Sequence, residues 1–195
     1  MSINDLLKNQ KCEMVRLEDV VDFNKYKQIG ASELEQLKDE NGDIQLLPSS
    51  NNYDWKTTEE KAKDLIQEGE VITLGRARYA NLKYCKGKFV SSNNIIITTK
   101  DEKFLCEKYL YYIIKNNEKT FYVETSTYPK FDSDIFKEFC INLPPLSTQL
   151  KIVEVLDKFT SLEKELEKEL EKRKLQYQYY RDKLLTFTDE EREKW

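Results

Sequence analysis

Apolar residues in the first 143 positions come in short groups whose spacing is that of strands in some places and of helices in others. The runs 70–74 (EVITL) and 94–99 (NIIITT) are typical of strands, whereas 103–114 (KFLCEKYLYYII) has the apolar spacing of a helix packed on a sheet. The full pattern predicts strands at 43–47, 70–74, 88–90, 94–99, 120–125 and 140–143, and helices at 15–23, 31–40, 57–69, 103–114 and 132–139. This mixture predicts an α+β fold class, with one globular domain of short strands and helices.

Polar residues at the starts of two predicted helices indicate how those helices begin. Ser32 with Glu35, and Thr57 with Glu60, have the spacing of a capping box, in which each side chain hydrogen-bonds the backbone N–H of the other residue. We therefore expect these residues to begin their helices, and Gly69 to end the second one.

A longer repeat follows Pro144 and Pro145. Neither glycine nor proline interrupts the next stretch, where Ser147 or Thr148 can cap a single helix over 147–187, about 60 Å long. Its apolar positions form a heptad seam with one four-residue stutter, typical of a coiled coil, flanked by Glu and Lys. The seam consists of Val155, Phe159, Leu162, Leu166, Leu170, Arg173, Tyr177, Tyr180, Leu184 and Phe187. Such a helix needs a partner helix to cover its apolar stripe.

These patterns divide the 195 residues into three parts. We expect a globular domain at 1–146, one long C-terminal coiled-coil helix at 147–187, and a terminal turn or tail at 188–195, where TDEE fits a further capping box. A composition with 39% hydrophobic and 35% charged residues allows a modest core and disfavours wholesale disorder.

Several functional classes lack the residues that they need. There is no histidine, and the cysteines at 12, 85, 106 and 140 form no CxxC pair, which disfavours a zinc site and every Ser-His or Cys-His nucleophile pair. The five glycines form no phosphate-binding loop. No apolar run approaches the roughly 18 residues of a membrane span, and the first residues lack a signal-peptide pattern. We expect a cytoplasmic protein without metal, cofactor or membrane association.

Parts of the sequence resemble two catalytic motifs but lack residues that these motifs require. An amino-methyltransferase needs Asn or Asp directly before Pro-Pro and an aromatic residue directly after it, whereas here Leu143 follows Asn142 and Leu146 follows the prolines. The triplets 59–61 and 101–103 match a metal-nuclease pattern only loosely, as chance allows in a chain that is 35% charged. The chain is therefore not expected to be an enzyme.

Charge is distributed unevenly within the globular domain. Residues 33–70 contain eleven acids and four lysines, whereas residues 71–100 contain six basic residues and no acid. The segment 74–88 (LGRARYANLKYCKGK) combines five of these basic residues with two tyrosines. Arg and Lys anchor phosphates, and Arg also reads guanine. The segment is either a focused DNA-binding surface or an ordinary solvated hairpin, and its composition alone leaves both open.

The end of the domain and the long helix together carry a family resemblance. The stretch LPPLSTQLKIVEVLDKF (143–159), followed by a helix ending in RKLQYQYYRDKLLTF (173–187), resembles the conserved region of specificity (S) subunits of type I restriction–modification systems. Its Pro-Pro-Leu-x-x-Gln pattern matches at Pro144, Pro145, Leu146 and Gln149. More loosely, 15–23, 69–98 and 124–144 resemble the entry, middle and end of the family's target-recognition domain, so the resemblance covers nearly the entire chain.

The resemblance implies a non-catalytic subunit that binds double-stranded DNA and directs modification (methyltransferase) subunits, with or without a restriction subunit, to a bipartite target. A full S subunit carries two recognition domains and two antiparallel helices, whereas this sequence shows one of each and resembles a half-sized form. A homodimer through the helix would then read an interrupted palindrome. The alternative is a fragment whose partner is a different half. The expected interface residues are Phe159, Leu162, Leu166, Leu170, Tyr177, Tyr180 and Leu184.

The candidate DNA-binding residues follow from the basic segment and the resemblance together. They are Arg76, Arg78, Tyr79, Lys83, Lys86, Lys88, Asn93, Tyr128 and Lys130. The competing hypothesis is a coiled-coil interaction or regulatory protein with no nucleic-acid role. The basic segment and the Pro-Pro-Leu-x-x-Gln junction favour the DNA-binding hypothesis.

Overall fold

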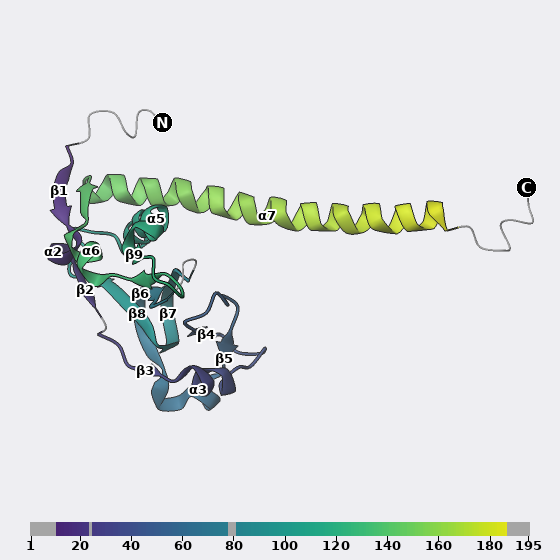
Figure 1. Cartoon of the computed structure of the whole chain (residues 1–195), viewed down its shortest axis with the longest axis horizontal. Coiled ribbons are helices and arrows are strands. Elements are labelled where there is room, and N and C mark those ends of the chain that lie inside the picture. Colours follow the sequence, from purple (N-terminus) through teal and green to yellow (C-terminus); the bar gives the residue numbers. More distant parts are fainter. Residues whose placement is uncertain (1–10, 24, 78–80, 187–195) are drawn as a thin grey trace, which may run out of the picture. The chain divides into compact units, whose positions relative to one another are not determined.

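Seven strands form the central sheet of the first of two compact units, which ends at Val153 (Figure 1). The structure is a computed structural model, and it describes residues 11–23, 25–77 and 81–186. The strands of the sheet are β2 (Val21–Phe23), β3 (Gln28–Ile29), β4 (Ile44–Leu47), β5 (Lys56–Thr57), β6 (Gln67–Gly75), β7 (Lys83–Ser92) and β8 (Asn94–Thr99). Their order is β2-β8-β6-β7-β4-β5, and β3 pairs with β7 outside this path.

Short helices and two small antiparallel sheets complete this unit. The helices are α2 (Leu17–Val20), α3 (Ala31–Gln36), α4 (Glu59–Ala62), α5 (Glu107–Asn117) and α6 (Ser133–Glu138), with 3-10 turns η1 (Lys63–Leu65) and η2 (Glu118–Phe121). The small sheets pair β1 (Glu13–Arg16) with β11 (Cys140–Leu143), and β9 (Tyr122–Val123) with β10 (Lys130–Phe131). Together with the long helix described below, this architecture confirms the predicted α+β class.

Strand β6 lies between β7 and β8 and is antiparallel to both. Ile72, near its middle, stands opposite Tyr84 of β7 and Ile97 of β8. Only Asn93 separates β7 from β8 along the chain, and it has a positive φ of 36°, which asparagine tolerates better than most residues. The chain leaves its pairing with β6 after Phe89 and resumes it on the other side of β6 at Asn94.

Both faces of the sheet are buried, each in its own hydrophobic cluster. Side chains alternate across a strand, so Val71 and Ile96 belong to one cluster, while Ile72 and Ile97 belong to another that includes Leu110 of α5. Burial on both faces explains why β6 and β8 read as nearly continuous apolar runs rather than alternating ones.

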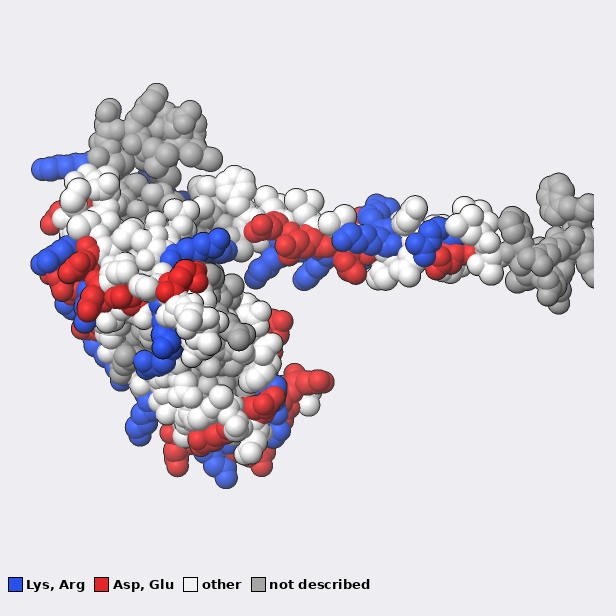
Figure 2. Space-filling view, viewed as in Figure 1, with Lys and Arg blue, Asp and Glu red and all other residues white. Residues whose placement is uncertain are grey.

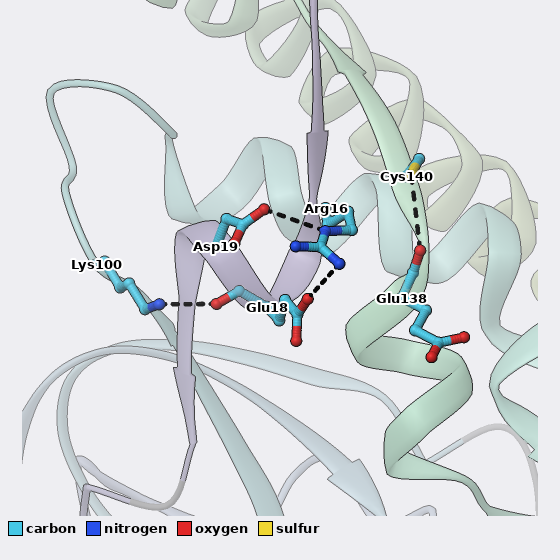
Figure 3. A network of polar contacts seen from close by, with 6 residues as sticks. All are labelled: Arg16, Glu18, Asp19, Lys100, Glu138 and Cys140. Atoms are coloured by element: carbon cyan, nitrogen blue, oxygen red, sulfur yellow. Dashed lines mark hydrogen bonds and ion pairs between the residues drawn. The ribbon is translucent and has the colours of Figure 1, made fainter.

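The β1–β11 pair joins strands from the two ends of the described part of this unit, with Arg16 opposite Cys140. Figure 3 shows the polar contacts beside it: the Arg16 guanidinium lies 2.8 Å from the Glu18 carboxylate and 3.4 Å from that of Asp19. Lys100 donates to the backbone carbonyl of Glu18 at 2.7 Å. These side chains are largely exposed, so the ion pairs contribute little stability, and the strand pairing holds the two ends together.

Both capping boxes predicted within the domain are wrong. Helix α3 begins at Ala31 and α4 at Glu59, and neither has a side-chain cap. Thr57 instead belongs to β5, where its side chain is fully buried. Gly69 lies within β6 and ends no helix. Pairing with β7 extends β6 back to Gln67, and this tertiary pairing overrides the helical pattern of 57–69.

Other predicted elements differ mainly in extent. The helix expected over 15–23 is limited to α2, between two strands, and the helix expected over 103–114 starts later, at Glu107. The strand expected over 120–125 is limited to β9, whereas β11 and β8 have their predicted bounds. The strands expected over 70–74 and 88–90 are parts of the longer strands β6 and β7.

The long helix α7 (Leu146–Leu185) corresponds to the helix predicted over 147–187. It begins at Leu146, so Ser147 and Thr148 lie inside its first turn instead of capping it. The second compact unit begins at Glu154 within this helix. Phe187 and the predicted tail at 188–195 lie outside the described residues. Across the described residues, no helix, α7 included, is long and apolar enough to cross a membrane.

Candidate nucleic-acid interface

Two lysines of β7, Lys86 and Lys88, lie close to acidic residues of neighbouring elements. Lys86 pairs with Glu70 of β6 across the strands, with 2.8 Å between ammonium and carboxylate, and Lys88 lies 3.5 Å from the Glu59 carboxylate. The hydrogen bond to Glu70 raises the pKa of Lys86. Figure 2 likewise shows acidic and basic side chains interspersed on the face in view. The segment that has no acid in the sequence is therefore partly neutralised in the fold.

Lys83 has a different role from the one its basic neighbours suggested. Its side chain is buried, and its ammonium donates hydrogen bonds to the backbone carbonyls of Pro48 and Ser50. Burial lowers its pKa to about 8. The ammonium thus ties the 48–50 loop to β7 from within the domain, and we leave Lys83 out of the candidate DNA surface.

Arg76 and Lys130 are brought together although they are far apart in the sequence. Ala77 forms an antiparallel bridge with Lys130, and the carbonyl of Arg76 accepts a hydrogen bond from the Phe131 amide at 3.1 Å. The Lys130 ammonium lies 5.9 Å from the centre of the exposed Tyr128 ring. The hairpin of β9 and β10 therefore places two of the candidate residues beside the end of β6.

The turn between β7 and β8 adds a polar residue to this region. Asn93 is exposed, and the carbonyl of the next residue, Asn94, accepts a hydrogen bond from the Arg76 guanidinium at 3.4 Å. We refer to Arg76, Asn93, Tyr128 and Lys130 as the recognition surface. Two further candidates, Arg78 and Tyr79, lie outside the described residues.

A depression of about 480 Å³ adjoins the recognition surface. Its lining residues are Phe23, Arg76, Ile95, Phe131, Ser133 and Lys137. They come from β2, β8, β10, α6 and the residue after β6, so no contiguous sequence motif marks the site. Phe23, Ser133 and Lys137 were consequently missed by sequence reasoning, and only knowledge of the strand pairing could have grouped them.

The glutamine of the Pro-Pro-Leu-x-x-Gln motif is a structural residue of the first unit. Gln149 is fully buried, and its side-chain oxygen accepts a hydrogen bond from the Cys106 amide at 2.9 Å. Its side-chain nitrogen donates to the carbonyls of Phe104 and Pro144, each at 2.9 Å. The motif therefore fixes the first turns of α7 to the loop before α5.

Another buried polar residue, Glu107 in the first turn of α5, is only 4% exposed. Its carboxylate accepts a hydrogen bond from the Thr99 amide at 2.8 Å, and burial raises its pKa to about 7. In the described ranges, no three Cys, Asp or Glu residues are grouped so as to hold a metal ion. Glu107 thus belongs to the packing between α5 and β8.

The apolar residues of the predicted seam are exposed from Phe159 to Leu184 of α7. The exposed fractions are 57% for Phe159, 53% for Leu162, 68% for Leu166, 56% for Leu170, 68% for Tyr177, 52% for Tyr180 and 70% for Leu184. Leu175, Tyr179 and Leu185 are also exposed and were not predicted as interface residues. Ion pairs spaced four residues apart, Glu154–Lys158 and Glu169–Arg173, support the helix itself. Exposed apolar stripes of this size are typical of interaction surfaces in proteins.

Comparison with known proteins gives consistent matches. The model of the type I restriction modification DNA specificity domain matches residues 9–172. The specificity subunit of the type I restriction enzyme MpnII of Mycoplasma pneumoniae is 30% identical over 137 residues, covering 68% of this chain and 42% of that protein. The specificity subunit of EcoR124I/EcoR124II of Escherichia coli is 36% identical over 109 residues, covering 53% of this chain and 27% of that protein.

A solved structure shows the same fold. The type I restriction–modification S subunit from M. genitalium superposes with a TM-score of 0.59 at 17% identity, covering 93% of this chain and 47% of that one. The chain spans less than half the length of each of these three proteins.

Proposed function

Since the chain belongs to the family of type I restriction–modification DNA specificity domains, we propose that it recognises a DNA sequence on behalf of a type I methyltransferase. The observation that carries the proposal is the family match over 9–172, which includes both the recognition domain and most of the long helix. The relatives named above are specificity subunits of restriction enzymes, which supports a target-reading role. A coiled-coil regulator without a nucleic-acid role is not favoured.

Within this function the chain provides recognition, and modification subunits provide methyl transfer. Its near-miss at 142–146 lacks the aromatic residue of an amino-methyltransferase, which supports a non-catalytic role. A restriction subunit joins the complex where cleavage accompanies modification. The complex acts on cellular DNA, and hence in the cytoplasm.

The recognition surface is our proposed site of contact with DNA. Arg76 can bind either a guanine edge or a phosphate, Asn93 can read an adenine, and Lys130 can pair with a phosphate. Lys86 and Lys88 are secondary candidates, because each must exchange a carboxylate partner for DNA. Arg78 and Tyr79 complete the proposed set.

The exposed seam of α7 supports a further part of the proposal, a homodimer. Pairing of two α7 helices would cover the apolar residues from Phe159 to Leu184 and bring two identical recognition domains to one DNA molecule. Two-fold symmetry would then make the target an interrupted palindrome.

Mapping of methylated bases tests the proposed function. Cells that lack other methyltransferases would express the chain with a type I modification subunit, and we expect methylation of one bipartite motif whose halves are inverted repeats. Arg76→Ala should cost about 1–3 kcal/mol of target binding if Arg76 contacts a base, and should reduce methylation at that motif. Lys56→Ala, on the edge strand farthest from β2, is the control. Methylation without any sequence preference would refute the proposal.

A further inference from the structure

The depression beside the recognition surface combines an apolar wall with two cationic side chains. Phe23 and Phe131 each contact Phe136 of α6 with ring centres 5.6 Å apart. Phe136 is fully buried, so these contacts hold the wall in place before any ligand binds. The depression belongs entirely to the first unit.

The charged residues of the depression are only weakly neutralised. Among the described residues Arg76 forms no ion pair, and its guanidinium is held by a single carbonyl contact at 3.4 Å. Lys137 lies 3.8 Å from the Asp134 carboxylate, and both side chains are exposed, so this pair is weak. Ser133 also lines the depression, and its hydroxyl lies 3.5 Å from the Asp134 carboxylate. The site therefore offers two cations to an anion.

We propose that this depression binds one phosphate of the DNA backbone, with the adjoining deoxyribose packed against Phe23 and Phe131. A sugar-phosphate unit has an apolar ring face next to a charged group, which matches an aromatic wall next to Arg76 and Lys137. The apolar wall lowers the local dielectric constant and strengthens the attraction between the cations and the phosphate. The inference rests on the proposed function, because the phosphate is supplied by the bound target.

A base would fit this depression less well than a sugar-phosphate unit. Reading a base edge requires a pattern of donors and acceptors, and among the described lining residues Ser133 has the only uncharged hydrogen-bonding side chain. Phosphate contacts carry no sequence information but fix the register of the protein on the duplex. Lys137 is thus a positioning residue, because holding this phosphate sets where Asn93 meets the bases.

The salt dependence of DNA binding by the complex of this chain with its modification subunits tests the proposal. Each neutralised phosphate contributes about 0.9 to the slope of log affinity against log salt. For Lys137→Gln we expect the slope to fall by about that amount, with target and unrelated duplexes weakened to the same extent. Lys137→Arg should keep the wild-type slope, and Lys56→Gln, which removes an exposed lysine elsewhere, should not change it.

The outcomes separate this inference from the proposed function. A wild-type slope in Lys137→Gln, or a loss of affinity confined to the target sequence, would overturn the phosphate site while leaving the function intact. A wild-type complex without preference for any duplex sequence would overturn both. Calorimetry could also show that deoxyribose 5-phosphate binds to the depression. If it binds while Lys137→Gln keeps the wild-type salt slope of DNA binding, the site belongs to a small metabolite and the DNA assignment is refuted. Urea unfolding of each variant confirms that the fold is retained.

Discussion

Gln149 is the residue of the Pro-Pro-Leu-x-x-Gln motif whose structural role is clearest. The carbonyl of Pro145 accepts hydrogen bonds from the Thr148 and Gln149 amides, which starts the helix. The Gln149 side chain then satisfies two carbonyls and one amide around the loop before α5. The spacing of the motif follows from this geometry, because a residue in the first turn of the helix must reach back to the proline that precedes it.

Replacing Gln149 with alanine should therefore destabilise the first unit strongly. Three backbone groups would lose their partner in a buried environment, and we expect the free energy of unfolding to fall by about 3 kcal/mol. Gln176→Ala, on the exposed part of α7, loses a single surface contact to Arg173 and should change it by less than about 0.5 kcal/mol. Urea unfolding measures both variants. Equal stability of the two would contradict the anchoring role of Gln149.

Glu107 gives the protein a pH-dependent stability of defined sign. Its pKa is raised to about 7 in the folded state by burial, from an ordinary value of 4.5. Between these two pH values the unfolded chain has lost the proton and the folded protein keeps it, so its contribution to stability decreases as the pH rises. Glu107→Gln should match the wild type near pH 4.5 and exceed it by about 3 kcal/mol near pH 8.

Urea unfolding at several pH values measures this difference. Gln176→Ala, which removes no titratable group, supplies the control and should keep a constant difference from the wild type across the same range. A Glu107→Gln variant whose advantage does not grow with pH would show that the carboxyl titrates at its ordinary pKa.

Residue type alone could not separate the exposed basic residues from the buried one. Arg76 and Lys83 lie seven positions apart in the same basic segment, yet Arg76 is exposed beside β10 and Lys83 binds two carbonyls in the interior. The difference depends on strand pairing. Lys83 lies opposite Thr73 of β6, whereas Arg76 follows the last residue of that strand. The sequence predicted that the site is basic, but it could not predict which of the basic residues belong to the site.

At the scale of elements, the bounds of β8 were predicted well, whereas those of β7 and the side-chain caps of α3 and α4 were not. The run NIIITT matches β8, because a strand covered on both faces has no polar alternation to obscure it. The capping box predicted for Thr57 and Glu60 is absent because Thr57 belongs to β5, where it pairs with Ile44 of β4. A capping box reports only a local preference, and strand pairing supplied hydrogen bonds that outweighed it.

This pairing between β4 and β5 requires a glycine in the turn that precedes β4. Gly42 packs so closely against the backbone of Thr57 that a Cβ atom would overlap its carbonyl group. We expect Gly42→Ala to lower the free energy of unfolding by about 1–3 kcal/mol, since backbone atoms must move to admit the methyl group. Thermal or urea unfolding checks the value.

Gly30 provides the matched control for this substitution. It precedes α3 with an ordinary negative φ, and a Cβ there would have nothing within 4 Å. Gly30→Ala should change stability by about 0.5 kcal/mol or less. Similar losses in both variants would show that the cost is a general effect of removing glycine and that the contact between Gly42 and Thr57 is not its cause.

For the whole molecule, the main unsatisfied feature is the apolar stripe of α7. A leucine side chain gains about 1.5–3 kcal/mol on full burial, and the seam exposes four leucines as well as its aromatic residues. Free energy on this scale favours association through the helix over an isolated α7. The heptad spacing was readable in the sequence, whereas the identity of the partner helix is not encoded in the spacing.

The double variant Leu166→Glu with Leu170→Glu tests whether the partner is a second copy. Placing four negative charges in a two-fold symmetric seam should abolish pairing, so we expect sedimentation at the monomer mass where the wild type sediments as a dimer. Lys164→Gln with Lys168→Gln lowers the net charge by the same amount on the opposite face of α7 and should remain dimeric. The pair of variants thus separates loss of the seam from a change in net charge.

The same variants link the dimer to the predicted symmetry of the target. If two copies read inverted half-sites, the monomeric Leu166→Glu/Leu170→Glu variant should lose methylation at the bipartite motif while its recognition unit unfolds in urea at the wild-type midpoint. A variant that stays dimeric would refute pairing through this seam. A monomeric variant that still directs methylation to the full palindrome would show that two recognition units are brought to the DNA by the modification subunits instead of by α7.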